Sequence, residues 1–406
     1  MFEKVAFWGM GLEGQAIYDF LIKKYPEINP IIIENDVLPD DADLVVLSPG
    51  VSVYKQSIID AKARGVKFTS LMNIFLEELY KQAKVPVVIG VSGTKGKSTT
   101  VSALAFMLGK LGFKVGLGGN IGKTPLEFLG QDLDYIVLEL SSFQIKSLDQ
   151  PIDVAAIVNL SRAHVDWHIT LENYFNDKLL LLDRAKKTVL NYQDEILQKM
   201  SPTAFYNKDD GFYFKDGKIF DQGEELEVPK LQIMGDHNLS NICCDLTILK
   251  MLGLDYKKGL AFLGEMPSLE HRLQNVLEHN GIMFVDDSIA TVPESVIAAI
   301  DTFKDKDVAL IIGGYDNGAM DYIKINEHIE KSPQVKVAVC LPDTGVMVKT
   351  SKSVQVKDMQ EAVEMALKYI DKGVVLLSPA AQSFNMFKNY KERGAVFVRA
   401  ARASAV

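Results

Sequence analysis

Short runs of apolar residues alternate along the chain with longer stretches in which apolar residues recur every three or four positions. The runs at 5–8, 31–33 and 44–47 predict strands, and the helical spacing over 17–21 predicts a helix between the first two. Strands that alternate with helices build parallel sheets, whose ligands bind at the carboxyl ends of the strands. The first 85 residues are therefore predicted to form a parallel sheet covered by helices.

The same alternation continues in the middle of the chain. Apolar runs at 85–89, 135–140 and 155–160 predict buried strands, the first of them bounded by Gly90. A turn-rich stretch of alternating residues at 209–227 predicts small antiparallel hairpins. The middle segment is thus a second α/β unit with a small β appendage.

A third α/β segment follows. The runs at 308–312 and 374–377 predict strands, and each ends in glycine or in Ser-Pro-Ala. The three segments predict three domains, with boundaries at 1–85, 86–272 and 273–406.

The most specific chemical signal follows the strand at 85–89. It is the string Gly93-Thr94-Lys95-Gly96-Lys97-Ser98-Thr99, which precedes apolar residues at helical spacing. Glycines let backbone N–H groups converge on a phosphate, and the helix N-terminus adds positive potential. In such a loop the lysine reaches the outer phosphates and the serine hydroxyl holds magnesium. The glycine that usually stands five positions before Gly96 is Val91, so the spacing departs from the common P-loop.

A second glycine-rich string, Gly9-Met10-Gly11-Leu12-Glu13-Gly14, follows the first strand. Glu34 ends the second strand about 20 residues later, as in dinucleotide-binding loops. By itself this pattern fits a tight strand–helix turn as well as it fits a nucleotide-binding loop. A nucleotide diphosphate of another kind would satisfy the same geometry.

Polar residues also end the strands that flank the phosphate loop. Glu139 ends one strand, and His164 and Asp166 follow the next. A carboxylate beside a phosphate loop is a natural ligand of magnesium, which takes few protein ligands. We expect Glu139 and His164 to lie at one edge of the sheet, whereas Trp167 and His168 fit a core and a site equally well.

Composition narrows the classes of partner. The 406 residues are 48% hydrophobic and 24% charged, which is ordinary for a globular protein, and the net charge is −9. An acidic chain is a poor partner for nucleic acid. The three cysteines, two of them adjacent, favour reduced thiols over a zinc site. With no apolar run long enough to span a bilayer and no signal-peptide core, we expect a cytoplasmic protein without a membrane partner.

The chain resembles the Mur ligase superfamily over essentially its whole length. The motifs that carry the resemblance stand in the family's order: the phosphate loop, Gly118–Gly122, Glu139–Gln144, Asn159–Asp166, Gly235–Asn238 with Asn241, His271-Arg272, Leu377–Ala380 and Phe387–Gly394. The strings at 138–144 and 378–390 are most similar to those of the glutamate-adding, MurD-type members. The resemblance implies an α/β protein of three domains. These are an N-terminal Rossmann-like parallel sheet for the UDP of the substrate, a central P-loop ATPase domain and a C-terminal Rossmann-like domain.

The resemblance also implies roles for individual residues. The ATP-binding residues would be Gly93, Thr94, Lys95, Gly96, Lys97, Ser98, Thr99, Asn241, Arg272 and Asp287. The UDP-substrate residues would be Gly11, Leu12, Glu13, Glu34, Ser48, Gly50 and Asn120. The glutamate-binding residues would be Thr291, Ser383, Phe384 and Tyr390. The magnesium-binding residues would be Ser98, Glu139, His164 and Lys178, and the catalytic residues Lys97, His164 and Lys178.

Lys178 owes its role to the resemblance alone. It lies in an amphipathic stretch at 174–180, which indicates a solvated lysine on a helix surface. It matches the lysine that this family carbamylates. A carbamate forms only from a neutral amine, so the pKa of Lys178 would have to be lowered.

The implied reaction joins an amino acid to a nucleotide-linked acid. The terminal carboxylate of UDP-N-acetylmuramoyl-L-alanine would attack ATP, and glutamate would displace phosphate from the acyl phosphate. ATP and Mg²⁺ are the implied cofactors, and we expect a monomer.

Three departures concern the amino-acid side of the site. Ile289 and Val292 stand where the family has lysine and asparagine, and Ala163 replaces the aspartate before the metal-binding histidine. The glycine-rich loop at 313–318 lacks the lysine that meets the carboxylate of glutamate. A buried carboxylate needs paired donors, so this loss should weaken or redirect glutamate binding.

Several functions therefore remain as alternatives. D-glutamate is favoured as the added amino acid, and the L-glutamate-adding subgroup is the alternative because it has similar strings at 287–294 and 313–316. Beyond these stand a non-catalytic nucleotide-binding protein on the same scaffold, a P-loop kinase or ATPase, and a folate-polyglutamylating relative. The non-catalytic protein is disfavoured by five intact residues, Lys97, Ser98, Glu139, His164 and Lys178. The kinase or ATPase is disfavoured by the C-terminal Ser-Pro-Ala segment. The glycine-rich domain at 1–85 disfavours the third.

Overall fold

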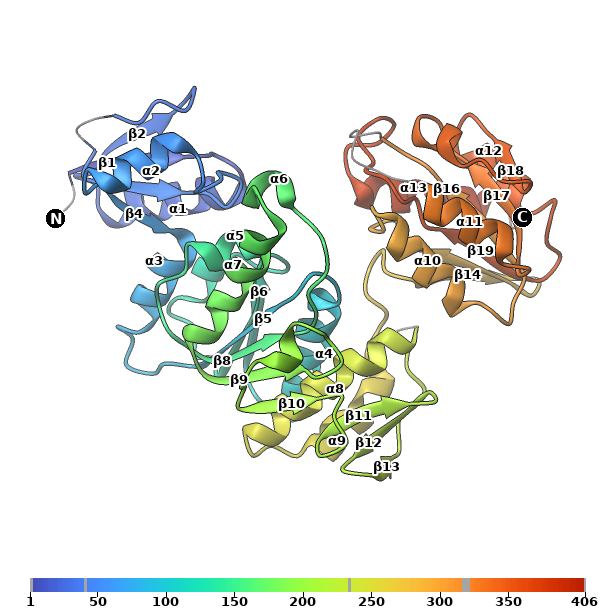
Figure 1. The fold of residues 1–406 in the computed structure, drawn as a ribbon, viewed down its shortest axis with the longest axis horizontal. Helices are drawn as coiled ribbons and strands as arrows, with labels where there is room; N and C mark the ends of the chain where they lie inside the picture. The colour runs from blue at the N-terminus through green and yellow to red at the C-terminus, as the bar shows by residue number, and fades with distance from the viewer. Residues whose placement is uncertain (1–2, 40–41, 233–234, 316–321, 405–406) are drawn as a thin grey trace. The chain divides into compact units, whose positions relative to one another are not determined.

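A computed structural model describes residues 3–39, 42–232, 235–315 and 322–404 (Figure 1). These residues form two compact units. The first comprises Met1–Lys230 with His237–Gly264, and the second Leu231–Asp236 with Glu265–Val406. Both units are built from sheets covered by helices, which confirms the predicted α/β class.

The N-terminal sheet has four parallel strands in the order β2-β1-β3-β4. They are β1 (Lys4–Trp8), β2 (Asn29–Ile33), β3 (Leu44–Leu47) and β4 (Lys67–Ser70), with helices α1 (Leu12–Lys24), α2 (Gln56–Ala63) and α3 (Leu71–Leu79). Alternate residues of β1 and β3 pack toward α1 and α3 on one face and toward α2 on the other. All three strands expected in this segment are confirmed.

The central sheet has six parallel strands in the order β10-β9-β8-β5-β7-β6. They are β5 (Val87–Ser92), β6 (Val115–Gly119), β7 (Tyr135–Glu139), β8 (Ile152–Ile157), β9 (Ala185–Asn191) and β10 (Ala204–Tyr206). The helices of this part are α4 (Lys97–Lys110), α5 (Ser142–Lys146), α6 (Val165–His168), α7 (Leu171–Asp183), α8 (Asp236–Met251) and α9 (Tyr256–Phe262). The short 3₁₀ turns are η1 (Pro125–Phe128), η2 (Leu197–Lys199) and η3 (Leu263–Glu265).

The expected hairpins at 209–227 are an antiparallel three-stranded sheet. Its strands are β11 (Phe212–Lys215), β12 (Lys218–Asp221) and β13 (Glu224–Leu226). Two expected strand bounds were wrong. β5 continues through Gly90 to Ser92, because Gly90 makes room for Ile152 and Leu140 rather than a turn: a Cβ there would lie 2.7 Å from Ile152 Cδ1. β8 ends at Ile157, where the chain turns toward the phosphate loop.

The second unit contains one six-stranded sheet in the order β14-β15-β19-β16-β17-β18, parallel except for the hairpin of β14 and β15. Its strands are β14 (Gln274–His279), β15 (Ile282–Asp286), β16 (Val308–Ile312), β17 (Val335–Cys340), β18 (Ser353–Gln355) and β19 (Gly373–Leu377). Its helices are α10 (Pro293–Thr302), α11 (Ile323–Lys331), η4 (Thr344–Met347), α12 (Met359–Ala366) and α13 (Tyr390–Ser404). α10 and α11 cover one face and α12 and α13 the other, as in a doubly wound sheet (Figure 1).

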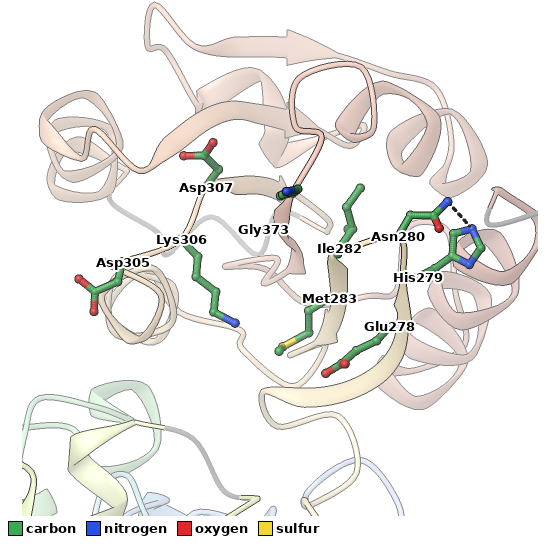
Figure 2. A pocket seen from close by; sticks show the side chains of 11 residues that line it. Glu278, His279, Asn280, Ile282, Met283, Asp305, Lys306, Asp307 and Gly373 are labelled. Carbon is green, nitrogen blue, oxygen red and sulfur yellow. Dashed lines mark hydrogen bonds between the residues drawn. The ribbon is translucent and has the colours of Figure 1, made fainter.

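A surface pocket of the second unit lies at the opposite edge of its sheet from the expected site. Figure 2 shows its lining, which includes Asp305, Lys306 and Asp307 before β16, and Gly373 at the start of β19. These positions are the amino ends of parallel strands, whereas ligands of such sheets bind at the carboxyl ends. We therefore do not place the functional site in this pocket. Within the described ranges, no helix combines the length and apolarity that crossing a membrane requires.

Asp245 of α8 is a buried acid outside the expected site. Its side chain is fully buried, and neither carboxylate oxygen has a hydrogen-bond partner within the described part of the chain. Burial raises the pKa of Asp245 well above its ordinary value of 3.8, because desolvation disfavours the carboxylate and favours the protonated form. The unfolded chain loses that proton at about pH 4. The contribution of Asp245 to the free energy of unfolding is therefore largest at low pH and falls as the pH rises toward its folded-state pKa.

Asp245→Asn should remove this pH-dependent cost while keeping the shape of the side chain. We expect the variant to gain free energy of unfolding over the natural protein as pH rises from 5 to 8, by up to about 1.4 kcal/mol per pH unit. Urea unfolding across this range measures the gain, with the exposed Asp210→Asn as the matched control. An equal difference at pH 5 and pH 8 would show that Asp245 does not titrate as described.

Candidate active site

The phosphate loop joins β5 to α4, as the sequence predicts. Gly93 has φ +147° and Gly96 has φ +82°, conformations that L side chains rarely adopt. A Cβ at Gly93 would lie 2.5 Å from Val158 Cγ2, and one at Gly96 would lie 2.7 Å from Asn241 Oδ1. Glycine is therefore required at both positions, and Asn241 of α8 lies directly against the loop.

Asn159 holds this loop in shape. Its side chain accepts a hydrogen bond from the Lys95 N–H and donates one to the Lys95 carbonyl, both at 2.9 Å. Its own carbonyl accepts from the Thr94 N–H at 2.9 Å. Asn159 was not among the predicted site residues, although a polar residue directly after a strand that flanks the loop was a usable signal.

Strand register places Glu139 beside the loop. In the parallel pairing of β5 with β7, Glu139 lies opposite Val91, two residues before Gly93. Glu139 Oε1 accepts a hydrogen bond from Asn120 Nδ2 at 2.9 Å, whereas the buried Oε2 has no partner within the described ranges. Asn120, expected on the UDP side, thus orients the predicted magnesium ligand. A cation next to Oε2 would compensate its lost hydration.

The side chains of Ser98 and Glu139 fit a magnesium ion. Within the described parts of the chain, no three His, Cys, Asp or Glu side chains cluster as a complete metal site. Mg²⁺ does not need such a cluster, because it usually keeps several waters and takes one or two carboxylates together with substrate phosphates. The buried Ser98, at the start of α4, and Glu139 supply oxygens of the required kind.

Lys178 lies under the phosphate loop. The amphipathic pattern indicated a solvated lysine, and this interpretation was wrong, since the residue is only 2% exposed. Its Nζ donates to the Gly93 carbonyl at 2.8 Å and lies 3.4 Å from Ser92 Oγ. Burial, and then the positive charge of Lys97, lower the pKa of Lys178 well below its ordinary value, while Glu139 opposes the shift.

His164 belongs to the same group of charges. It precedes α6 with a left-handed backbone, φ +50°, and its ring packs edge-on against Phe143. Desolvation, followed by the charges of Lys178 and Lys97, lowers its pKa. A neutral imidazole keeps a lone pair free for a metal or a proton. Lys97, Glu139, His164 and Lys178 are therefore brought into one electrostatic neighbourhood, as predicted from the motifs.

The N-terminal glycine-rich loop is tightly packed against its own backbone and against the residue that follows β3. Ser48 Oγ donates to the Gly9 carbonyl, and a Cβ at Gly14 would lie 2.0 Å from that same oxygen. Gly11 caps α1 without a side chain, and Leu12 is 94% exposed at the loop tip. Gly50 and Glu34 are exposed beyond the ends of β3 and β2, so all these predicted UDP-binding residues lie at the carboxyl edge of the sheet.

Glu13 connects this loop to the central sheet. Its Oε1 accepts a hydrogen bond from Gln144 Nε2 at 2.7 Å, and Gln144 in turn caps Ser141 at the start of α5. Burial raises the pKa of Glu13 to about 7, although the bond from Gln144 opposes the shift.

In the second unit, Asp287 is buried at the carboxyl end of β15. Its Oδ2 accepts from Ser378 Oγ at 2.7 Å, and its Oδ1 accepts from the Leu273 N–H at 3.3 Å. Burial raises the pKa of Asp287 to about 7, while these bonds and the charge of Arg272 lower it. Arg272 and Asp287 therefore lie close together, as their shared predicted role requires.

Three of the four predicted glutamate-binding residues lie next to two loops that Arg393 joins, and the fourth, Tyr390, begins α13. The fully buried side chain of Arg393 donates to Ser288 Oγ and to the Ser288, Ala381 and Gln382 carbonyls at 2.8–3.0 Å. Thr291 follows the first of these loops, whereas Ser383 and Phe384 follow the second. Tyr390 packs edge-on against His271. Residues 316–318 of the expected glutamate loop lie outside the described residues.

Comparison with known proteins identifies the family. The model of the Mur ligase middle domain matches residues 91–249. A UDP-N-acetylmuramoyl-L-alanine--L-glutamate ligase of Xanthomonas euvesicatoria pv. vesicatoria is 31% identical over 448 aligned residues, covering 98% of this chain and 94% of the relative. The chain belongs to the Mur ligase family. This Mur ligase is also 32% identical to a UDP-N-acetylmuramoylalanine--D-glutamate ligase of Pseudomonas savastanoi pv. phaseolicola, across 94% of the chain and 88% of the relative.

A solved structure supports the fold of the ligase. MurF ligase from Thermotoga maritima, in complex with ADP, has a TM-score of 0.67 at 18% identity and covers 100% of this chain and 96% of that one. The superfamily resemblance inferred from the motifs is confirmed, and the protein is an ATP-dependent, amide-bond-forming ligase.

Gly96→Ala should weaken nucleotide binding, because the added Cβ collides with Asn241 and strains the loop backbone. Gly112→Ala is the matched control: Gly112 also has a positive φ, +98°, but no atom lies within 4 Å of its added Cβ. Calorimetric titration with ADP should show a loss of about tenfold or more for Gly96→Ala, equivalent to about 1.4 kcal/mol. Gly112→Ala should bind like the natural ligase. Equal affinity of the two variants would contradict the role assigned to Gly96.

Proposed function

We propose that this Mur ligase adds glutamate to UDP-N-acetylmuramoyl-L-alanine in peptidoglycan precursor synthesis. The observation that carries the proposal is the phosphate loop with Lys97, beside the buried Lys178 and Glu139, whose Oε2 has no hydrogen-bond partner among the residues that the structure describes. This arrangement suits the activation of an acid by ATP. The two relatives with glutamate-ligase names supply the substrate class.

In the first step, an oxygen of the substrate carboxylate attacks the γ-phosphorus of ATP, and ADP leaves. The product is an acyl phosphate, whose phosphate is a good leaving group. Both reactants are anions, so the protein must neutralise charge. Lys97 and the N-terminus of α4 provide positive potential where the phosphates would lie.

In the second step, the neutral amine of glutamate attacks the acyl carbon. Phosphate leaves with the bridging oxygen, and the amine proton is lost to a base. Water would destroy the intermediate, so the site must exclude it while glutamate binds. The proposed glutamate contacts are Thr291, Ser383, Phe384 and Tyr390.

Mg²⁺ would be held by Ser98, Glu139 and His164. Bound there, the ion would offset the negative charge of the phosphate oxygens. The proposed ATP contacts outside the loop are Asn241, Arg272 and Asp287. The proposed UDP contacts are Gly11, Leu12, Glu13, Glu34, Ser48, Gly50 and Asn120. Cytoplasmic location and a monomeric state stay predictions.

Carbamylation of Lys178 is part of the proposal. The neutral amine attacks CO₂, the new N–C bond forms as one C=O π bond opens, and the nitrogen loses one proton to give a carbamate anion. Burial beside Lys97 disfavours the ammonium form and supports this reaction. The carbamate would add an anionic oxygen ligand for a cation close to Glu139.

L-glutamate is a second candidate for the added amino acid. D-glutamate is the first choice, but Ile289 and Val292 replace the polar residues that MurD-type members have. Relatives named for each enantiomer match this chain at similar identity.

Phosphate release in the presence of ATP, Mg²⁺ and UDP-N-acetylmuramoyl-L-alanine tests the proposal. We expect release only when glutamate is added, with one enantiomer at least about tenfold better by kcat/KM. Lys97→Ala should reduce kcat by about a thousandfold, which is typical for the loss of a preorganised group that stabilises charge in the transition state.

Three outcomes would contradict this account. Release without glutamate would indicate a kinase or ATPase. The absence of phosphate release with both enantiomers of glutamate would indicate a non-catalytic nucleotide-binding protein. A Lys97→Ala variant with near-normal turnover would remove the phosphate loop from the mechanism.

Lys178→Ala should be severely impaired and partly rescued by acetate, because a short carboxylate can occupy the place of the carbamate. The exposed Lys186→Ala is the matched control and should be neither impaired nor rescued. The same phosphate assay, with acetate raised stepwise at constant ionic strength, measures the rescue. Full activity of Lys178→Ala without acetate would exclude the proposed role.

A further inference from the structure

A chain of buried hydrogen bonds joins α7 to α5 next to the candidate site. Asp177 Oδ2 lies 2.6 Å from His168 Nδ1, and His168 Nε2 lies 2.9 Å from Ser142 Oγ. The three side chains are 1%, 0% and 2% exposed. The order Asp–His–Ser resembles that of a hydrolytic triad, but a serine so deeply buried cannot meet a substrate. These three hydrogen-bonded side chains are therefore suited to holding other groups in place, and not to reacting with a substrate.

Asp177 also binds the segment that follows β3 of the N-terminal sheet. Both of its oxygens lie within 3.0 Å of the Tyr54 hydroxyl, which donates to the carboxylate. Lys146 Nζ forms an ion pair with Oδ1 at 2.8 Å. Tyr54 lies on the segment after β3, which also carries Ser48 and Gly50, two proposed contacts of the UDP-linked substrate.

Trp167 makes a second connection to that segment. Its Nε1 donates to the Pro49 carbonyl at 3.0 Å, and its own carbonyl accepts from Ser52 Oγ at 2.6 Å. Its ring is part of the apolar core of the N-terminal sheet, together with Ile58 and Val45. The short helix α6 is therefore anchored in the N-terminal core through Trp167, and to α7 and α5 through His168.

The backbone on both sides of α6 is strained. His164 has φ +50° and Ile169 has φ +69°, and a β-branched residue rarely adopts this conformation. Ile169 is 60% exposed, so packing of its own side chain does not hold it there. Such strain persists only where surrounding contacts fix the chain. The contacts next to these turns include those of Trp167, the bond of His168 with Asp177, and the bond that the His168 carbonyl accepts from Asn173 Nδ2 at 2.9 Å.

We propose that Asp177 is a positioning residue. It sets the distance between the segment proposed to bind the UDP-linked substrate and the turn that carries His164 beside the phosphate loop. Through His168 it fixes the turn that carries His164, and through Tyr54 it fixes the segment that carries Ser48 and Gly50. A UDP-linked substrate held by that segment then presents its carboxylate to the phosphate loop. This inference rests on the proposed function.

Asp177→Asn and Tyr54→Phe test the positioning role. The amide cannot accept from Tyr54, Lys146 and His168 together, and the loss of the Tyr54 hydroxyl removes one bond while the ring keeps its shape. We expect Asp177→Asn to raise the KM for UDP-N-acetylmuramoyl-L-alanine by about tenfold, and Tyr54→Phe by less, while the KM for ATP changes less than about twofold. The exposed Asp210→Asn is the matched control and should leave both values unchanged.

Tryptophan fluorescence tests, without enzyme turnover, whether Asp177 holds the segment around Trp167 in place. The chain has two tryptophans, so Trp8→Phe leaves Trp167 as the only reporter. In this background Asp177→Asn should make Trp167 fluorescence easier to quench with acrylamide, and calorimetry should show weaker binding of UDP-N-acetylmuramoyl-L-alanine without ATP.

The outcomes separate the two proposals. An inactive natural ligase with either glutamate would contradict the proposed function, while fluorescence and UDP binding still test Asp177. Suppose that the natural ligase is active and that Asp177→Asn lowers only the thermal stability or kcat, while both KM values and the quenching stay unchanged. Asp177 would then have a purely structural role, and the inference would be overturned. Equal increases in both KM values would do the same.

Discussion

A buried lysine under the phosphate loop is the interaction on which the rest of this site depends. Lys178 donates to the Gly93 carbonyl from α7, and its charge is disfavoured there by burial and by Lys97. The Gly93 carbonyl of the loop is thus bound by an amine whose pKa is lowered by the charge of Lys97. Glu139, buried with one oxygen that lacks a hydrogen-bond partner among the described residues, is the negative charge that opposes this shift.

Parallel pairing brings this neighbourhood together. β7, β5 and β8 are adjacent, and their carboxyl ends carry Glu139, the phosphate loop and Asn159. One residue of register shift would turn Glu139 toward the opposite face of the sheet. The site therefore depends on the core that fixes the register, including the close approach of Gly90 to Ile152.

The fold was largely predictable because its strands are uninterrupted apolar runs and its loops carry specific glycine patterns. The position of Lys178 was not, since a lysine among leucines on a helix has the same pattern whether its head group is solvated or buried. The chain of Asp177, His168 and Ser142 was also beyond prediction. His168 and Asp177 are nine residues apart on either side of the left-handed Ile169, Ser142 lies 26 residues before His168, and Tyr54 lies 123 residues before Asp177. The resemblance to a family supplied Lys178, but not Asp177.

Transfer of ¹⁸O tests the central claim, that the substrate acid is activated as an acyl phosphate, most directly. UDP-N-acetylmuramoyl-L-alanine labelled with ¹⁸O in its carboxylate is incubated with the ligase, ATP, Mg²⁺ and the active enantiomer of glutamate. Mass spectrometry of the released phosphate should find one ¹⁸O atom per molecule formed from doubly labelled substrate, because the attacking oxygen leaves with phosphorus. Unlabelled phosphate accompanied by amide product would contradict the mechanism.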